Sequence, residues 1–387
     1  MSGFEIATAT RIVFADGASA RLGEHARAAV GPDVSTVLCV TGRGDRAHAA
    51  RASLEAAGMT LVPLAIGGEP TTEDAREAVS LARGRGVRAV VAIGGGAALD
   101  RGKAVAVLAT HDGDPLDYLE VVGKGRALER DGLPFVAVPT TAGTGSEVTK
   151  NAVLADPRTR VKVSMRSERM LPRLALVDPE LTISVPPAVT AATGLDALTQ
   201  VIEPFVSCAA TPFTDGLARE GIVRGARSIR AAYANGDDRD ARRDLATTSL
   251  FGGLCLANAK LGVVHGLAGP IGGAFDAPHG ALCARILPRA LEVNLRAVRA
   301  RGSAAQQARF DELARLLTGR ADAQAEDAAL FVDELVRDLA IPALTAHGIS
   351  HADVASLVEK GERASSTKGN PLVLTPRELT EILERAL

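Results

Sequence analysis

Short apolar runs alternate with amphipathic segments along the first half of the chain. The apolar runs are rich in β-branched residues and end in turns, which is typical of strands; they lie at 35–42, 61–68, 87–96 and 133–141. The segments between them carry apolar residues at helical spacing. This alternation predicts a parallel sheet with crossover helices. Residues 1–17 alternate polar and apolar positions and predict a short β-hairpin before the first of these runs.

The pattern changes near residue 184. Three further short extended segments occupy much of 151–183, after which the chain is rich in Ala, Leu and Arg with a 3.6-residue period. Ser184 is predicted to cap a helix whose first turn accepts Pro186 and Pro187, because the first helical N–H groups need no partner within the helix. We therefore predict an α/β domain over residues 1–184 and an all-helical domain over residues 185–387, with a ligand cleft between them.

Length, charge and cysteine content narrow the class of protein. A chain of 387 residues exceeds the size at which single cores usually stop growing, which favours two domains. The net charge of -2 gives no electrostatic case for nucleic acid or an anionic membrane as partner. No apolar run approaches a membrane span, and residues 1–17 lack the basic and apolar regions expected of a secretory signal. The four cysteines form no CxxC pair, and we expect buried free thiols in a soluble, cytoplasmic protein that binds a small molecule.

Two glycine-rich loops point to a dinucleotide. The string IGGGAALDRGKA (93–104) follows an apolar strand and opens a helix, whose N–H groups and positive dipole end would face a phosphate. A glycine triplet alone also fits a tight turn. The string VPTTAGTGSEVT (138–149) leaves a second strand with several hydroxyl side chains that suit a pyrophosphate. Two such loops at the carboxyl ends of one sheet favour a dinucleotide site.

These strings also carry a family resemblance. With VDPEL (177–181), TGLDALT (193–199), VHG (264–266) and APHG (277–280), they occur in the order seen in group III iron-containing alcohol dehydrogenases, which the whole chain resembles. The resemblance implies a dehydroquinate synthase-like architecture: an α/β dinucleotide-binding domain with a parallel sheet, then an all-α domain. It implies NAD or NADP as cofactor, contacted by Gly95, Gly96, Ala97, Asp100, Thr140, Thr141, Thr144, Thr149 and Lys162. Ala97 replaces the family's usual serine, which removes one hydroxyl donor.

The same resemblance implies a divalent metal, iron or zinc, held by one Asp and three His. Such an ion stabilises negative charge on the substrate oxygen during hydride transfer. The matching positions are Asp196, Gln200, His265 and His279, so Gln200 stands where the family has His. Asp196 and Gln200 lie four residues apart on one predicted helix face. Gln is a weak neutral donor, which leaves metal binding open. Gly269 stands where the family commonly has a further histidine near the substrate.

The residues after the first main strand bear on the choice of cofactor. Enzymes that select NAD usually place an acidic residue near this strand end, where it binds the ribose and repels a 2′-phosphate. Here Gly42 and Arg43 occupy that region. They would accommodate NADP, although a polar surface turn explains them equally well.

The sequence therefore predicts an NAD(P)-dependent alcohol dehydrogenase or carbonyl reductase that acts on a small aldehyde, ketone or alcohol. The catalytic residues are expected to be the four metal-site residues, in a homodimer or higher homo-oligomer. Three alternatives stay open: an oxo-acid reductase of the maleylacetate reductase type, a dehydroquinate synthase-like lyase that uses NAD internally, and a nucleotide-binding protein that has lost catalysis.

Overall fold

The chain divides into two compact units in the computed structural model, which describes residues 3–42, 44, 46–120, 122–159, 161–275 and 277–387. The α/β unit comprises residues 6–141 and 145–184. The helical unit comprises residues 1–5, 142–144 and 185–387. Residues 142–144, from the second glycine-rich loop, therefore group with the helical unit, although the chain on either side of them belongs to the α/β unit.

The α/β unit contains a parallel sheet, as predicted. Among the described residues its strand order is β1-β8-β5-β4-β2-β3, and every neighbouring pair runs parallel. The strands are β1 (Ile12–Phe14), β2 (Thr36–Thr41), β3 (Thr60–Ala65), β4 (Ala89–Gly94), β5 (Phe135–Pro139) and β8 (Leu174–Val177). The central strands β4 and β5 are buried along their whole length, which explains their continuous apolar runs.

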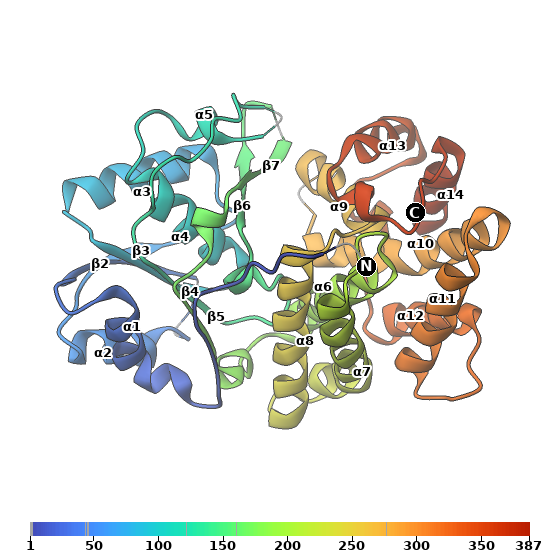
Figure 1. Cartoon of the computed structure of the whole chain (residues 1–387), viewed down its shortest axis with the longest axis horizontal. Coiled ribbons are helices and arrows are strands. Elements are labelled where there is room, and N and C mark those ends of the chain that lie inside the picture. The colour runs from blue at the N-terminus through green and yellow to red at the C-terminus, as the bar shows by residue number, and fades with distance from the viewer. Residues whose placement is uncertain (1–2, 43, 45, 121, 160, 276) are drawn as a thin grey trace. The chain divides into compact units, whose positions relative to one another are not determined.

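Helices cover both faces of this sheet, which Figure 1 shows with α3 and α4 above it and α1 and α2 below. Alternate residues of β2 point to opposite faces: Leu38 and Val40 pack on the α3–α4 side, and Val37 packs on the α1–α2 side. The helices of this unit are α1 (Leu22–Val30), α2 (His48–Ala56), α3 (Thr72–Gly84), α4 (Gly96–Leu108) and α5 (Pro115–Tyr118).

The hairpin predicted for residues 1–17 is wrong. Strand β1 pairs in parallel with β8, with Ile12 opposite Ala175. The alternation of polar and apolar positions correctly indicates an extended chain, but its partner is distant in sequence. The antiparallel hairpin of this unit is formed by β6 (Asn151–Asp156) and β7 (Val161–Arg166).

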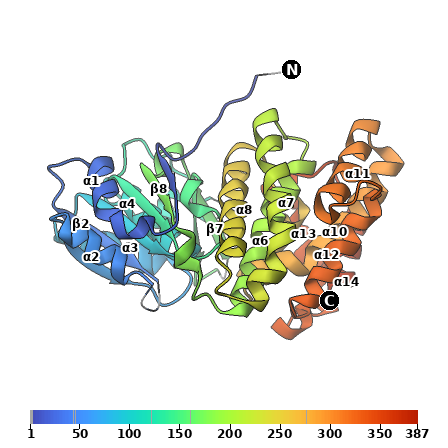
Figure 2. The same cartoon turned by 90° about the horizontal axis from the view of Figure 1, so that it is seen from below.

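The helical unit is built from long helices that pack side by side, and Figure 2 shows α8, α6 and α7 in this arrangement. Its helices are α6 (Pro187–Val206), α7 (Pro212–Ala234), α8 (Arg239–Asn258), α9 (Val263–Ala274), α10 (His279–Arg301), α11 (Ala304–Thr318), α12 (Ala325–Asp338), α13 (Val354–Arg363) and α14 (Pro376–Ala386). Helix α6 begins at Pro187 and follows Pro186, but the predicted Ser184 cap is wrong. Among the described residues no side chain caps α6, because its cap position is taken by Pro186.

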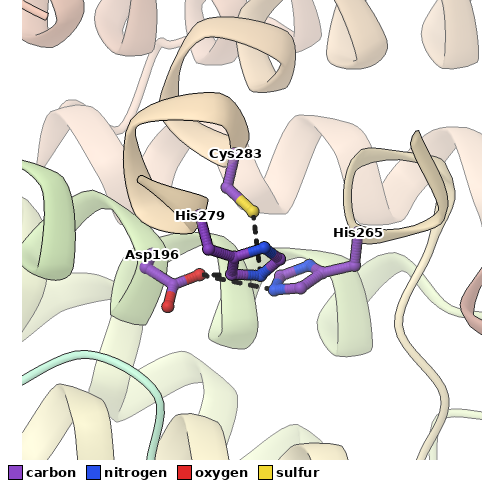
Figure 3. A group of neighbouring side chains, drawn as sticks. All are labelled: Asp196, His265, His279 and Cys283. Carbon is purple, nitrogen blue, oxygen red and sulfur yellow. Dashed lines mark hydrogen bonds and ion pairs between the residues drawn. The ribbon is translucent and has the colours of Figure 1, made fainter. Parts of the chain in front are cut away.

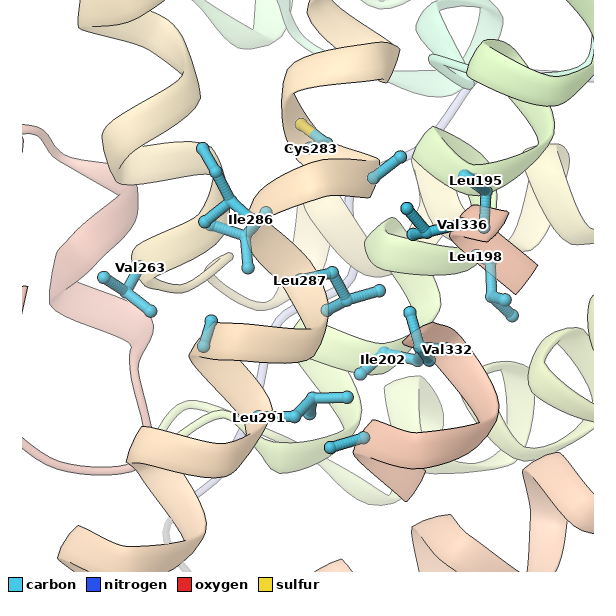
Figure 4. Close-up of a cluster of buried hydrophobic side chains, with 14 of the residues drawn as sticks. Leu195, Leu198, Ile202, Val263, Cys283, Ile286, Leu287, Leu291, Val332 and Val336 are labelled. Atoms are coloured by element: carbon cyan, nitrogen blue, oxygen red, sulfur yellow. The ribbon is translucent and has the colours of Figure 1, made fainter. Parts of the chain in front are cut away.

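One apolar core holds the helical unit together, and Figure 4 shows the part of it where α6, α10 and α12 meet. Leu195, Leu198 and Ile202 recur on α6 at spacings of three and four residues within this core, and Ile202 lies beside Leu291 of α10 and Val332 of α12. All of these side chains are nearly inaccessible to solvent. The packing fixes the register of α6 against α10, and both helices carry candidate site residues, Asp196 near the middle of α6 and His279 at the start of α10.

Among the described residues, no single helix has the length and hydropathy needed to cross a bilayer; only α8 and α9 together pass such a test, and they are bent by 97° at the break between them.

Candidate active site

Four side chains with metal-binding atoms meet inside the helical unit. They are Asp196 of α6, His265 of α9, and His279 and Cys283 of α10, and Figure 3 shows them converging. Their potential ligand atoms all lie within 4.8 Å of one another. Asp196 Oδ1 lies 3.4 Å from Nε2 of His265 and 3.9 Å from Nε2 of His279. The structure thus brings together three of the residues singled out from the sequence, and adds a cysteine that sequence reasoning treated as an inert thiol.

Close packing of two helices places Asp196 beside His279. A Cβ atom at Gly280 would lie 2.3 Å from the backbone oxygen of Ala192 and 3.2 Å from Cβ of Asp196. Only glycine allows this approach of α10 to α6. The glycine after His279 therefore belongs to the construction of the site.

Glu203 positions His265 by contacting the ring nitrogen that faces away from Asp196. Its Oε2 lies 2.6 Å from Nδ1 of His265, and its Oε1 accepts the backbone N–H of Val264 at 2.7 Å. This carboxylate fixes the tautomer in which Nδ1 carries the proton and leaves Nε2 free to face Asp196. Sequence reasoning missed Glu203, although its position seven residues after Asp196 places it on the same face of α6.

The substitution Glu203→Gln is expected to weaken metal affinity by about 10- to 100-fold, because an amide holds the imidazole less firmly and lowers its basicity. Titration with Co²⁺ in competition with a chelator measures the effect. Glu220→Gln, an exposed change on α7, serves as the control. Equal affinity in Glu203→Gln and the control would show that Glu203 does not position the ligand.

Gln200 is turned toward a backbone segment. Its Nε2 donates to the carbonyl of Gly143 at 3.0 Å, and Ser249 Oγ accepts the N–H of the same glycine at 2.8 Å. Gln200 thus anchors residues 142–144 to the helical unit. Within the described part of the chain, Gln200 Oε1 and Asp196 Oδ1 are buried without a hydrogen-bond partner. Two buried oxygen acceptors left unsatisfied fit a site that receives a cation.

Charge interactions within the cluster shift its pKa values. The negative charge of Cys283 raises the pKa of His279 to about 9, against the opposing effect of burial. Burial lowers the pKa of His265, but the negative charge of Cys283 and the nearby Asp196 carboxylate outweigh it, and the pKa lies well above its ordinary value. A cation that binds these imidazoles has to displace their protons, so acid conditions weaken its binding.

Position 269 in α9 carries no side chain that could relay a proton. A Cβ atom at Gly269 would meet no described atom within 4 Å. There is thus open space beside Gly269, and the histidine expected from the family at this position is absent.

In the α/β unit, the predicted cofactor loop lies at the start of α4. Gly95 is the residue that caps α4, and among the described residues no side chain caps its first turn. Gly95, Gly96 and Ala97 are half-buried. The uncapped first turn and the positive end of the helix dipole are therefore available to an anion.

Several other predicted cofactor residues gather around this loop. The Thr140 N–H donates to the carbonyl of Gly94 at 3.0 Å. A Cβ atom at Gly95 would lie 3.3 Å from Oγ1 of Thr141, and one at Gly42 would lie 3.6 Å from Cα of Gly94. The ends of β2, β4 and β5 thus meet at one edge of the sheet. Arg43 lies outside the described residues.

The remaining predicted cofactor residues are engaged with protein groups. Ser146 Oγ donates to Asp100 at 2.6 Å, and the Val153 N–H donates to its other oxygen at 2.9 Å. The ammonium group of Lys103 is fully buried and donates to Thr149 Oγ1 at 2.9 Å. Burial lowers the pKa of Lys103 to about 8, despite the charge of Asp100.

These contacts tie α4 to β6. The other two predicted residues are placed differently: Lys162 of β7 forms an ion pair with Glu69, and Thr144 is half-buried within the segment that groups with the helical unit.

A cavity of about 410 Å³ lies against α3 of the α/β unit. Its two arginines are already engaged: Arg76 pairs with Asp114, and Arg83 donates to backbone carbonyls at the end of α4. The cavity therefore offers little free hydrogen-bonding capacity to a ligand.

Comparison with known proteins identifies the class. A family model described as "Iron-containing alcohol dehydrogenase" matches residues 9–179, and one described as "Fe-containing alcohol dehydrogenase family, C-terminal" matches residues 190–387. A 1,3-propanediol dehydrogenase from Klebsiella pneumoniae is 36% identical over 328 residues, which are 83% of this chain and 82% of that protein. The crystal structure of a 1,3-propanediol oxidoreductase has a TM-score of 0.91 and 31% identity, with all of both chains covered.

A long-chain-alcohol dehydrogenase 1 from Geobacillus thermodenitrificans is 49% identical over 220 residues, which are 57% of this chain and 55% of that protein. Together with the fold, these matches define an oxidoreductase, an alcohol dehydrogenase by class. The chain belongs to the iron-containing alcohol dehydrogenase family, as the sequence motifs implied.

Proposed function

We propose that this chain transfers a hydride between NAD(P)(H) and a small aldehyde, ketone or alcohol, with a divalent metal held by Asp196, His265 and His279. The observation that carries the proposal is the convergence of a carboxylate and two imidazoles in a buried site with unsatisfied oxygen acceptors. When bound, a divalent ion supplies a Lewis acid for the substrate oxygen. Three protein ligands suffice for many catalytic zinc sites.

The chain's own residues supply the remaining parts of this activity. The uncapped N-terminus of α4 would bind the pyrophosphate, with Thr140 and Thr141 beside it. Asp100 holds Ser146 in the second loop and so positions that loop. Gln200 fixes residues 142–144 through the Gly143 carbonyl, with its Oε1 left to accept a hydrogen bond from substrate or to act as a weak ligand.

The test is oxidation of NADH and NADPH with a panel of short aldehydes, ketones and oxo acids, including maleylacetate, with metal content measured on the same sample. Net consumption of the reduced cofactor with a short aldehyde is expected. Preference for maleylacetate would favour the oxo-acid reductase. Absence of net turnover with every carbonyl compound would favour a lyase or a protein without catalysis.

Gly42→Asp is expected to shift the preference toward NADH by about tenfold, because a carboxylate there repels a 2′-phosphate and accepts the ribose hydroxyls. The structure accommodates the change, since a Cβ at Gly42 makes only ordinary contact with Gly94. The ratio of kcat/KM values for the two cofactors measures it. Gly42→Asn is the matched uncharged control, and an equal ratio in both variants would remove Gly42 from cofactor selection.

We also propose a homodimer or higher homo-oligomer in the cytoplasm. The support is the edge strand β1, which among the described residues pairs only with β8 and leaves its other side open to a second copy. Light scattering on the purified protein tests the oligomer, and a monomer at all concentrations would contradict it.

A further inference from the structure

Cys283 points its thiol into the group of metal-binding atoms. Its Sγ lies 3.5 Å from Nε2 of His279, and it stands four residues after His279 on the same face of α10. Figure 3 shows the sulfur beside the histidine rings. The thiol, the two imidazoles and the Asp196 carboxylate fall within the 4.8 Å that one ion can bridge.

The simplest alternative is that Cys283 is a small apolar core residue, since free cysteines are commonly buried. Figure 4 shows that Cys283 does border the apolar cluster of α6 and α10. Cys255 gives the comparison: it is equally buried, but its thiol donates to a backbone carbonyl, that of Thr214, at 3.5 Å. Cys283 differs because a carboxylate and two imidazoles face its sulfur.

The surroundings of Cys283 matter because the other candidate ligands include one weak donor. Gln200 replaces an imidazole by a weak neutral donor, and its amide nitrogen is held by Gly143. A thiolate supplies a strong anionic donor, so Cys283 restores a set of four good ligands. A thiolate with two imidazoles and a carboxylate is also a softer set than one of oxygen and imidazole alone, and it suits zinc.

We propose that Cys283 is the fourth protein ligand of the metal site, in place of the imidazole missing at position 200, and that the site selects zinc over iron. The inference rests on the proposed function only in so far as both place an ion at Asp196, His265 and His279. Binding of the ion replaces the thiol proton, which leaves to solvent, by a sulfur–metal bond, and the oxidation state of neither changes.

The direct test loads the metal-depleted full-length protein with Co²⁺ and records its absorption. Sulfur coordination produces a charge-transfer band in the near ultraviolet, and we expect this band in the unaltered protein. Cys283→Ser is expected to lose the band, whereas Cys255→Ser is expected to keep it. Co²⁺ bound without the band in the unaltered protein would overturn the proposal, and this measurement requires no variant to fold.

Affinity gives an independent readout. In competition with a chelator, Cys283→Ser is expected to bind zinc with an affinity more than about 100-fold lower. This loss is larger than the one usually seen when a residue that only supports a metal ligand is changed. Adding Gln200→His to Cys283→Ser is expected to recover much of this affinity and to raise the ratio of bound iron to bound zinc. Unchanged zinc affinity in Cys283→Ser, or failure of the double variant to exceed the single one, would count against the assignment.

The outcomes separate this inference from the proposed function. A charge-transfer band in a protein whose metal-free form reduces aldehydes at full rate would support Cys283 as a ligand and overturn metal assistance. Metal-dependent activity with Co²⁺ bound but no sulfur band would support metal assistance and overturn Cys283 as a ligand.

Discussion

Replacing His265 by alanine is expected to remove the bound metal and to lower kcat by about 10³-fold or more. A Lewis acid contributes several kcal/mol to stabilising charge on the reacting oxygen, and each 1.4 kcal/mol is about tenfold in rate. His265 is buried and is held by Glu203, so its replacement by alanine removes an oriented imidazole from the ligand set. Metal content and aldehyde reduction are measured on the same preparation.

Exhaustive chelation of the unaltered protein is expected to give the same loss, and metal added back is expected to restore activity in the unaltered protein only. His351→Ala, which removes an exposed imidazole in the same unit, is the control. Full activity in protein shown to be free of metal would end the metal-assisted mechanism. Hydride transfer would then depend on His265 or His279 as hydrogen-bond donors to the carbonyl.

Gly280→Ala is expected to destabilise the helical unit by about 1–3 kcal/mol, the usual cost of overpacking. The added methyl group would stand 2.3 Å from the Ala192 carbonyl, so α10 has to move away from α6. That movement separates His279 from Asp196, and metal affinity is expected to fall by more than about tenfold. Denaturant unfolding and Co²⁺ titration measure the two effects.

Gly216→Ala is the matched control, because Gly216 also lies within a helix, α7, but a Cβ there meets no described atom within 4 Å. It is expected to leave stability unchanged or raise it by up to about 1 kcal/mol, since alanine favours helix more than glycine does. Metal affinity that is equal in the two variants would show that the close approach at Gly280 does not shape the site.

The sequence predicts the fold well where periodicity alone decides it. The buried runs of β4 and β5 and the amphipathic helices between strands were sufficient to predict the parallel sheet. Pairing partners were not predictable in the same way, because alternation in residues 1–17 shows which positions face the core but not which strand lies beside them. In the structure, strand β1 pairs with β8, which is distant in sequence, and the alternation of residues 1–17 did not indicate this partner.

Site residues that lie in sequence motifs could be predicted. Site residues that are brought in only by tertiary contacts could not be predicted as well. Asp196, His265 and His279 meet as their motifs implied. Cys283 escaped notice because a lone cysteine in an apolar helix is most often core, and only folding shows that its sulfur faces imidazoles. Cys208 is exposed, contrary to the expectation of buried thiols.

All members of the metal cluster belong to the helical unit, and this has a thermodynamic consequence. A ligand that binds only the native state adds RT ln(1 + [L]/Kd) to stability, about 2.7 kcal/mol at a hundred times Kd. Metal binding would therefore stabilise the helical unit, while binding of the dinucleotide would stabilise the α/β unit. A shortage of metal would then destabilise the helical unit, and a shortage of cofactor would destabilise the α/β unit. Each shortage would expose a different part of the chain to proteolysis.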